Sequence, residues 1–308
     1  MSMLKTAIVT GSNGYIGSAL VRNLLESGSD VHALIHRDSG RLTSLLPSNR
    51  IHAIGDDPER VSNLVASTNP NAIFHLAAIN TEAPNLAQLL SILQCSVVLG
   101  AALLHGATMC SNPPVFINTG SYWQFGEAAT GGAPNSAYGA AKQAMHHLLL
   151  YFRSVRGLHG VTLVLYDVFG PDDPRPKLWT ALGKLSRGSS IAVTEGKQRV
   201  ELVHVSDVIL AMRSAAEQLC ANRLPDPIYA VHSDERLTLR ELLERLNRAA
   251  DLNLHFLWGA RPYPAGQIFH PWEGKSLPNW KPQMASVTSL SALLRMTLPP
   301  KNVPHIAL

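Results

Sequence analysis

A tyrosine and a lysine four residues apart, Tyr138 and Lys142, form a pair of side chains suited to acid–base chemistry. Residues at positions i and i+4 lie on the same face of a helix, so the two side chains would be neighbours. A lysine ammonium near a phenol favours the phenolate and lowers the pKa of the tyrosine towards the working range. A tyrosine tuned in this way both gives and takes a proton. We therefore predict that Tyr138 and Lys142 are catalytic.

Ser121 and two aromatic residues precede this pair in the stretch FINTGSYWQF. Ser121 follows the apolar run 115–117, at the carboxyl end of a predicted strand, from where its hydroxyl can hydrogen-bond the same substrate oxygen as Tyr138. Tyr122 and Trp123 come next, and we expect their rings to shape and dry a substrate pocket. Core packing of Trp123 is the alternative.

A glycine-rich turn near the start of the chain predicts where a dinucleotide binds. TGSNGYIG places Gly11, Gly14 and Gly17 directly after an apolar run and at the start of a helical pattern. Glycines there let the backbone turn tightly and approach a pyrophosphate, whose charge the helix N-terminus stabilises. The spacing is GxxGxxG rather than the common GxGxxG, and a bare structural turn is the alternative. The predicted cofactor site takes in this loop with Asn13, Tyr15 and Ile16.

The end of the second predicted strand indicates which dinucleotide binds. NAD sites usually carry an acidic residue there, about 20 residues after the glycines, to hold the ribose hydroxyls. This chain has His36 and Arg37 instead, so a 2′-phosphate would meet a cation. We predict NADP(H), with NAD as the alternative if Asp38 turns back to the ribose or Arg37 is only a solvated surface residue. Asp56, after the third predicted strand, is expected at the adenine amino group, and an aspartate that caps a turn is the alternative.

Apolar runs alternate with helical patterns through the first half of the chain, at 4–9, 31–35, 51–54, 72–76, 115–117 and 161–166. Runs buried on both faces with helices between them predict an α/β fold, a Rossmann-type doubly wound parallel sheet. After Gly170 the prolines cluster, and helical patches at 237–250 and 286–295 lie among irregular segments. We expect residues 1–170 to form the NADP(H)-binding domain, with about 199–231 returning to it. Residues 171–308 are expected to form a smaller, mixed substrate-binding lobe at the carboxyl ends of the strands.

The composition is that of a folded protein. The 308 residues are 46% hydrophobic and 16% charged, which excludes intrinsic disorder. The net charge of +4 is spread without a basic block, so we expect an anionic small molecule as partner, and neither nucleic acid nor a membrane.

The three cysteines form no CxxC pair and the chain opens directly into a strand, which predicts a reduced, cytoplasmic protein. Polar residues interrupt the apolar stretch 86–109, and we expect it not to span a bilayer.

Metal-binding patterns are weak in this sequence. HExxH is absent, and the adjacent His146 and His147 would point to different faces of a helix. We therefore predict that the protein holds no metal.

In order and spacing, the motifs of this chain resemble those of the extended short-chain dehydrogenase/reductase family along nearly the whole length. The shared motifs are TGSNGYIG, FHLAA, a serine before an aromatic-Gly pair, YxxxK, VFGP and RVELVHVSDV. The resemblance implies that Ser121, Tyr138 and Lys142 form a catalytic trio. Tyr138 would give a proton to a carbonyl oxygen as hydride arrives from the nicotinamide, Ser121 would polarise that carbonyl, and Lys142 would also hold the nicotinamide ribose. Leu76, Ala77 and Ala78 of FHLAA join the predicted cofactor site.

Within this family, the residues after Ser121 indicate the reaction. The 4,6-dehydratases carry an Asp-Glu or similar pair at the positions of Tyr122 and Trp123, and neither aromatic residue can remove a carbon-bound proton. A 4-epimerase usually retains NAD, whereas an NADP(H) site is typical of an enzyme that consumes reductant. The chain resembles the reductases that complete 3,6-dideoxyhexose or 6-deoxyhexose biosynthesis by reducing a 4-keto nucleotide sugar, CDP- or dTDP-linked. A 4-epimerase with tightly bound NAD and a non-catalytic NADP-binding sensor are the alternatives.

Further residues are predicted to contact the substrate. Asp167 is included in the predicted substrate site. It stands where the family pattern has an asparagine, and its side chain donates no hydrogen bond to a diphosphate unless it is protonated. We assign the cations Arg175, Lys177 and Arg199 to the substrate diphosphate, each with a solvated surface charge as the alternative. Asp207 is expected to cap a helix or anchor backbone. The segments 86–109 and 138–156 resemble the helices that pair across the dimer in this family, which predicts a homodimer.

Overall fold

A large parallel sheet forms the centre of the protein in the computed structural model, which describes residues 4–36, 42–81, 85–127, 131–175, 177–185 and 187–297. Its strand order is β10-β6-β5-β4-β1-β2-β3, and each neighbouring pair is parallel. The strands are β1 (Thr6–Thr10), β2 (Asp30–Ile35), β3 (Ile51–Ala53), β4 (Ala72–His75), β5 (Val115–Ser121), β6 (Gly160–Leu165) and β10 (Ile228–Ala230). The predicted doubly wound parallel sheet is confirmed.

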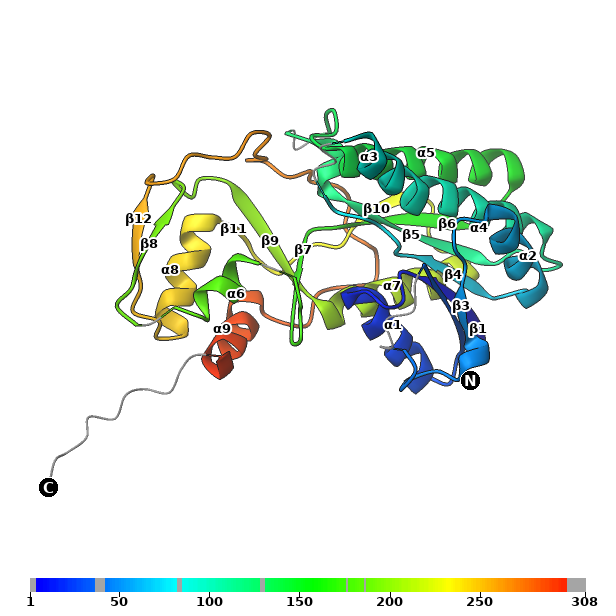
Figure 1. Cartoon of the computed structure of the whole chain (residues 1–308), viewed down its shortest axis with the longest axis horizontal. Coiled ribbons are helices and arrows are strands. Elements are labelled where there is room, and N and C mark those ends of the chain that lie inside the picture. Colours follow the sequence, from blue (N-terminus) through cyan, green and yellow to red (C-terminus); the bar gives the residue numbers. More distant parts are fainter. Residues whose placement is uncertain are drawn as a thin grey trace, which may run out of the picture.

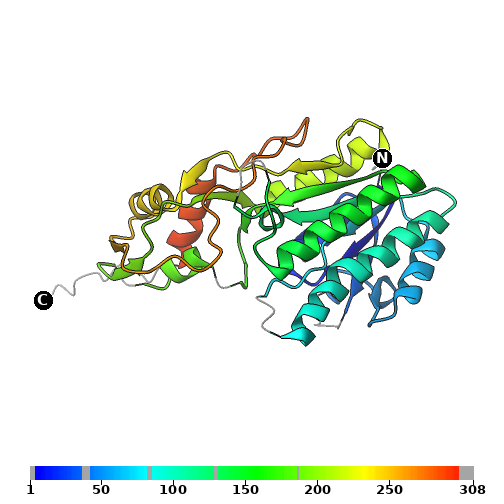
Figure 2. The same ribbon diagram turned by 90° about the horizontal axis from the view of Figure 1, so that it is seen from above.

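Helices cover both faces of this sheet (Figures 1 and 2). One face carries α1 (Tyr15–Glu26) and α7 (Val205–Cys220). The other carries α2 (Pro58–Thr68), α4 (Leu99–Met109) and α5 (Ala137–Arg156). The π-helical turn η2 (Gln94–Val98) joins α3 (Leu86–Leu93) to α4, and two 3-10 turns, η1 (Ser48–Arg50) and η3 (Tyr122–Phe125), precede β3 and follow β5.

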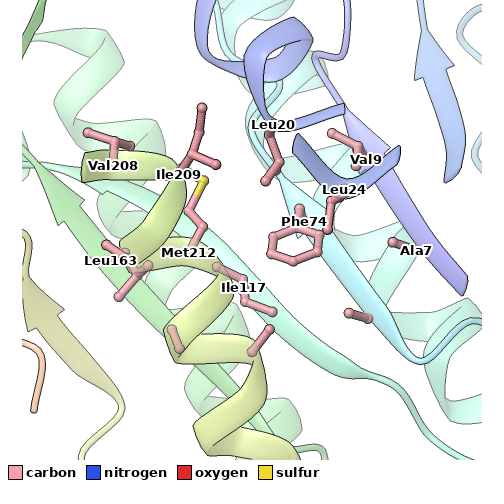
Figure 3. Close-up of a cluster of buried hydrophobic side chains, with 14 of the residues drawn as sticks. Ala7, Val9, Leu20, Leu24, Phe74, Ile117, Leu163, Val208, Ile209 and Met212 are labelled. Atoms are coloured by element: carbon pink, nitrogen blue, oxygen red, sulfur yellow. The ribbon is translucent and has the colours of Figure 1, made fainter. Parts of the chain in front are cut away.

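Two apolar cores, one on each face, hold the helices to the sheet. Figure 3 shows the α1 and α7 side, where Leu24 of α1 lies beside Phe74 of β4, and Met212 of α7 beside Ile117 of β5. Phe116, the preceding residue, belongs to the core on the opposite face, because successive strand residues point to opposite sides. This double burial explains why the strands appear in the sequence as continuous apolar runs.

A smaller lobe lies at one end of the large sheet (Figure 1). It contains the strands β7 (Asp167–Phe169), β9 (Arg199–His204) and β11 (Arg236–Thr238) in the order β11-β9-β7, and the parallel pair β8 (Ser190–Val193) and β12 (His255–Trp258). Its helices are α6 (Leu178–Leu182), α8 (Leu239–Ala249) and α9 (Ser286–Thr297). Because β9 pairs with β7 and β11, we propose that the return to the large sheet, expected over about 199–231, consists chiefly of α7 and β10. We propose that the two parts divide near Gly170.

The helical run Leu86–Met109 is apolar despite its polar residues. Its mean hydropathy of 1.9 and its length would suffice for a membrane span. On composition alone, the polar residues within this run therefore do not exclude a membrane span. One such helix is weak evidence for a membrane. In the fold, α4 packs on α2 and on the sheet, while Leu86 and Leu90 of α3 are exposed.

The segment 259–285, which we call the strap, links the smaller lobe back to the large domain (Figure 1). The Trp272 ring stacks on Phe125 at 4.3 Å between centroids, and the Tyr166 hydroxyl donates to the Trp272 carbonyl at 2.5 Å. Asp207, which is buried at the start of α7, accepts from the backbone N–H groups of residues 283 and 284, each at 3.0 Å. The prediction that Asp207 anchors backbone is confirmed.

Candidate active site

The glycine loop between β1 and α1 is packed so closely that side chains do not fit. Gly11 has a φ of +65°, and a Cβ there would lie 2.9 Å from the backbone nitrogen of Ala77. A Cβ on Gly17 would lie 2.1 Å from the carbonyl oxygen of Gly11. The Gly14 N–H closes the turn by donating to the same carbonyl oxygen at 2.9 Å. Glycine is therefore required for this loop to turn and for α1 to start beside it.

This loop fits the pyrophosphate of a dinucleotide. Gly14 is the N-cap of α1, no side chain caps the helix there, and its first turn contains no acidic residue. The N–H groups of a first helical turn and the positive end of the helix dipole favour an anion at this position. The Thr10 hydroxyl accepts from the N–H groups of Leu76 and Ala77, at 3.1 and 3.2 Å, which fixes these two predicted cofactor residues beside Gly11.

The other residues of the predicted cofactor site near the glycine loop differ in burial and contacts. Asn13, Ile16 and Ala78 are half-buried. Tyr15 turns towards the segment after β7, where the Arg175 guanidinium lies 4.8 Å from its ring centroid and its buried hydroxyl has no hydrogen-bond partner among the described residues.

The adenosine end of the predicted site is exposed. His36 and Asp56 lie at the surface after β2 and β3. Asp57, and not Asp56, caps α2 by accepting from the Arg60 N–H at 3.1 Å. Arg37 and Asp38, on which the choice between NADP(H) and NAD depends, lie outside the described residues.

The structure brings the predicted catalytic trio together. Ser121 ends β5 and is 8% exposed, and Tyr138 lies in the first turn of α5, which Ser136 caps. A side-chain hydrogen bond joins Ser121 to Tyr138. Lys142, one turn further along α5, is only 2% exposed, with its Nζ 5.8 Å from the centroid of the Tyr138 ring.

Burial dominates the charge state of Tyr138. It raises the pKa of the phenol to about 12, although the hydrogen bond with Ser121 and the charge of Arg175 act in the opposite direction. The prediction that a nearby lysine brings this pKa below its ordinary value is therefore wrong for this structure, because loss of solvation outweighs the favourable charges. Near neutral pH the phenol is protonated and available as a proton donor.

Burial also lowers the pKa of Lys142, to about 8, with Cys95 acting in the opposite direction. The Lys142 Nζ donates to the Thr119 hydroxyl at 3.1 Å, and that hydroxyl donates to the His75 carbonyl oxygen at 3.0 Å. The His75 ring is itself held between the Thr10 hydroxyl and the Ser96 carbonyl of η2, each at 2.9 Å. Through the backbone and the ring of His75, these hydrogen bonds connect Lys142 with Thr10, at the strand end that carries the glycine loop.

Two residues that hold the trio were not predicted. Thr119 precedes Ser121 by two positions, and the period of two along a strand is a signal that both side chains face α5. Gln124 is 1% exposed, its Oε1 accepts from the Ser121 N–H at 3.1 Å, and its Nε2 donates to Gln143 of α5 at 2.9 Å. The pattern Ser-x-x-Gln is a capping-box signal from which this contact is predictable.

Tyr122 and Trp123 form an aromatic wall next to the trio. Trp123 packs edge-on against both Tyr138 and Tyr122, at 6.3 Å between ring centroids in each case. Tyr122 stacks on Tyr166 at 5.6 Å. Burial holds the pKa of Tyr122 far above its usual range, so this phenol stays neutral.

Each predicted substrate cation has an acidic partner within the chain. Arg175 forms a two-point contact with Asp173, each bond 2.7 Å, and donates to the Val168 carbonyl at 2.8 Å. Lys177 pairs with Asp167 at 2.9 Å, and Asp167 also accepts from the Tyr122 hydroxyl at 3.5 Å. The structure thus joins three predicted substrate residues, Asp167, Lys177 and Tyr122, in one polar cluster.

Arg199 stands apart from that cluster. Its side chain is 53% exposed at the start of β9, 3.9 Å from Glu273 of the strap.

The groove between α2 and α4, about 450 Å³ in volume, is lined by residues such as Ser62, His105 and Met109 and by none of the predicted site residues. Among the described residues, no group of three or more His, Cys, Asp or Glu side chains is arranged to hold a metal ion.

Comparison with known proteins gives the family. The model of the NAD dependent epimerase/dehydratase family matches residues 7–231. The chain belongs to this family. CDP-abequose synthase of Yersinia pseudotuberculosis is 24% identical over 275 residues, which cover 85% of this chain and 94% of that protein. Membership makes this chain an enzyme of the extended short-chain dehydrogenase/reductase class, whose members modify nucleotide sugars with a nicotinamide cofactor.

Solved structures of other family members share the fold. UDP-glucose 4-epimerase of Thermotoga maritima, solved with UDP-glucose, superposes with a TM-score of 0.77 at 21% identity, covering 94% of this chain and 97% of that one. DesIV, a dTDP-glucose 4,6-dehydratase of Streptomyces venezuelae solved with NAD, has a TM-score of 0.74 at 20% identity, covering 94% and 96%. At these identities, the likeness extends to the fold and not to the substrate.

Proposed function

We propose that the protein reduces the 4-keto group of a 6-deoxyhexose or 3,6-dideoxyhexose nucleotide with NADPH. The observation that carries this proposal is the protonated, buried Tyr138, hydrogen-bonded to Ser121 at the end of β5 and close to Lys142. A ketone that becomes an alcohol needs a proton donor at its oxygen, and a phenol with a pKa of about 12 is in the donor form.

Each member of the trio has a distinct part in this reaction. The Ser121 and Tyr138 hydroxyls hydrogen-bond the keto oxygen, and Tyr138 transfers its proton as negative charge develops there. Lys142, buried and cationic below a pH of about 8, stabilises the phenolate that remains. A reduced nicotinamide dinucleotide, held by its pyrophosphate at the glycine loop, would supply the hydride.

The aromatic wall supports reduction over 4,6-dehydration. Dehydration needs an acid and a base beside the carbons that lose water, directly after the serine of the trio. Trp123 carries no titratable group, and the Tyr122 phenol stays neutral because its pKa lies far above its usual range. Neither side chain removes a proton from carbon.

The preference for NADPH rests on His36 and Arg37, which follow β2 in the sequence at the position where NAD sites usually carry a carboxylate, so that Arg37 offers a cation to a 2′-phosphate. Among the family members, the DesIV structure contains NAD, so a direct comparison of the two cofactors is needed.

The test is to follow NADPH and NADH absorbance in the presence of CDP- and dTDP-linked 4-keto-6-deoxy and 4-keto-3,6-dideoxy sugars. We expect oxidation of NADPH with at least one of them, and a smaller kcat/KM with NADH. No oxidation with any of these ketosugars would refute the proposal. Tightly bound NAD in the purified protein, with turnover of an ordinary nucleotide sugar without added cofactor, would identify a 4-epimerase. Unchanged biological activity of Tyr138→Phe would instead support a non-catalytic sensor.

We further propose a cytoplasmic homodimer, paired through α3 and α5. Leu86 and Leu90 on α3 and Tyr151 and Val155 on α5 are exposed apolar side chains that a second copy would cover. Light scattering should give twice the chain mass for the wild type and the monomer mass for a Leu90→Glu, Val155→Glu double variant. A Met296→Glu variant, at an equally apolar exposed position on α9, should remain dimeric. A monomeric wild type would contradict the proposal.

A further inference from the structure

The ammonium group of Lys142 has one hydrogen-bond acceptor within the described part of the chain, the hydroxyl of Thr119. The Nζ–Oγ1 distance is 3.1 Å, and the two residues are only 2% and 5% exposed. No carboxylate there pairs with Lys142. A buried ammonium is costly unless a partner offsets its lost hydration, so a single acceptor has a large share in keeping the charge.

The orientation of Thr119 makes it an acceptor towards Lys142. A hydroxyl has one proton, and Thr119 donates its proton to the His75 carbonyl oxygen at 3.0 Å. The lone pairs therefore remain for the lysine. The His75 carbonyl is fixed in turn, because the His75 ring bonds to the Thr10 hydroxyl and to the Ser96 carbonyl.

The titratable groups that face Lys142 provide no compensating negative charge near neutral pH. Tyr138 on its own helix is protonated, with a pKa raised to about 12. Burial raises the pKa of the Cys95 thiol on η2 and lowers that of His75 on β4 to about 4, so both groups are neutral. Arg175, which acts on Tyr138 from the segment after β7, is a cation.

We infer that Thr119 is a positioning residue for the reaction: its hydroxyl holds Lys142 in the ammonium form beside Tyr138 and thereby sets the alkaline limit of activity. The inference rests on the catalytic part proposed above for Lys142. Valine has a shape similar to that of threonine but lacks the hydroxyl oxygen. The inference therefore predicts that Thr119→Val leaves Lys142 in place and that Lys142 loses its proton at a lower pH.

The experiment compares Thr119→Val and Thr119→Ser with Thr162→Val. Thr162 is a matched control, because it is fully buried on the neighbouring strand β6 and bonds to Asn118 and His146, and not to Lys142. One readout is the pH profile of kcat/KM for NADPH-dependent ketosugar reduction. The second is a ¹³C NMR titration of lysine-labelled protein without substrate, with Lys142→Met identifying the resonance.

In Thr119→Val we expect the alkaline limb of kcat/KM and the Lys142 titration to move down by about one pH unit or more, because a hydrogen bond to a charged group is lost. Thr119→Ser and Thr162→Val should titrate as the wild type does. An unshifted Lys142 resonance in Thr119→Val, or the same shift in Thr162→Val, would overturn the inference. Thr119→Ala carries the same prediction if the valine variant does not fold.

The NMR titration needs no turnover, so it separates the two proposals. A wild type that is inactive on every ketosugar counts against the proposed function alone, whereas the titration still decides the part of Thr119.

Discussion

Burial moves the pKa values of Tyr138 and Lys142 in opposite directions, to about 12 and about 8, because it disfavours the charged form of each. Below a pH of about 8, the pair consists of a neutral phenol and an ammonium. This state suits reduction, which needs a proton donor and a cation beside the phenolate that is left. Oxidation of an alcohol would need the phenolate at the start, so these protonation states support the proposed reductive direction.

Tyr138→Phe removes the proton donor and keeps the ring that packs against Trp123. We expect kcat for ketosugar reduction to fall about 10²- to 10⁴-fold, the usual contribution of a positioned acid. Steady-state NADPH oxidation measures it. Tyr151→Phe on the exposed side of the same helix is the control and should change kcat little. Activity of Tyr138→Phe within a few-fold of the wild type would remove Tyr138 from the chemistry.

The sequence predicted which residues meet at this site better than it predicted their charge states. The four-residue spacing of Tyr138 and Lys142 defines one helix face regardless of surroundings. The pKa of Tyr138 depends on how deeply the phenol is buried, which only the packed structure determines. Similarly, nothing in the spacing of Arg175 and Asp173 shows that the two side chains bind each other in two places.

At the level of elements, the glycine loop and α1 meet at a backbone contact that leaves no room for a methyl group. Gly17→Ala would bring a Cβ to 2.1 Å from the Gly11 carbonyl oxygen, and only a shift of backbone relieves that contact. We expect the dissociation constant for NADPH to rise at least about tenfold, because the N–H groups that we predict to bind the pyrophosphate would move. Fluorescence titration measures it, and Ser18→Ala in the same turn should bind normally. Normal binding by Gly17→Ala would separate this loop from the cofactor.

Most strands of the large sheet were predictable, and those of the smaller lobe were not. Each apolar run of the large sheet corresponds to a strand, because burial on both faces leaves a continuous signal. The smaller lobe is built from strands such as β11, with three residues, and β8 and β12, with four, which are too short for periodicity to show. The π-helical turn η2, whose Ser96 carbonyl bonds to the His75 ring, also leaves no pattern in the sequence.

For the molecule as a whole, two buried histidines tie stability to pH. Burial lowers the pKa values of His75 and His146 from 6.5 to about 4. The native state therefore binds fewer protons than the unfolded state between these values, and the free energy of unfolding falls as pH falls. For the fully buried His75 the loss amounts to about 3 kcal/mol. We expect the free energy of unfolding, measured with urea, to contain a constant contribution from His75 above pH 6.5. That contribution should decline steadily from pH 6.5 towards pH 4.

The adjacent pair His146 and His147 offers a matched test of this dependence. His146 is 7% exposed and bonds to Thr162, whereas His147 lies at the surface. His146→Gln should make the decline between pH 6.5 and 4 less steep and leave the part due to His75, and His147→Gln should leave the whole decline unchanged. Equal slopes in both variants would show that His146 does not carry the effect.

The strap makes the order of synthesis matter for this enzyme. Phe125, just after the trio's serine, receives the ring of Trp272, and Glu127 receives the N–H groups of Phe269 and His270. Domains fold as units while the chain leaves the ribosome, starting from the N-terminus. The glycine loop, Ser121 and Tyr138 therefore emerge well before the strap residues that contact Phe125 and Glu127. A nascent chain has the chemical groups of the trio before the strap can pack beside them.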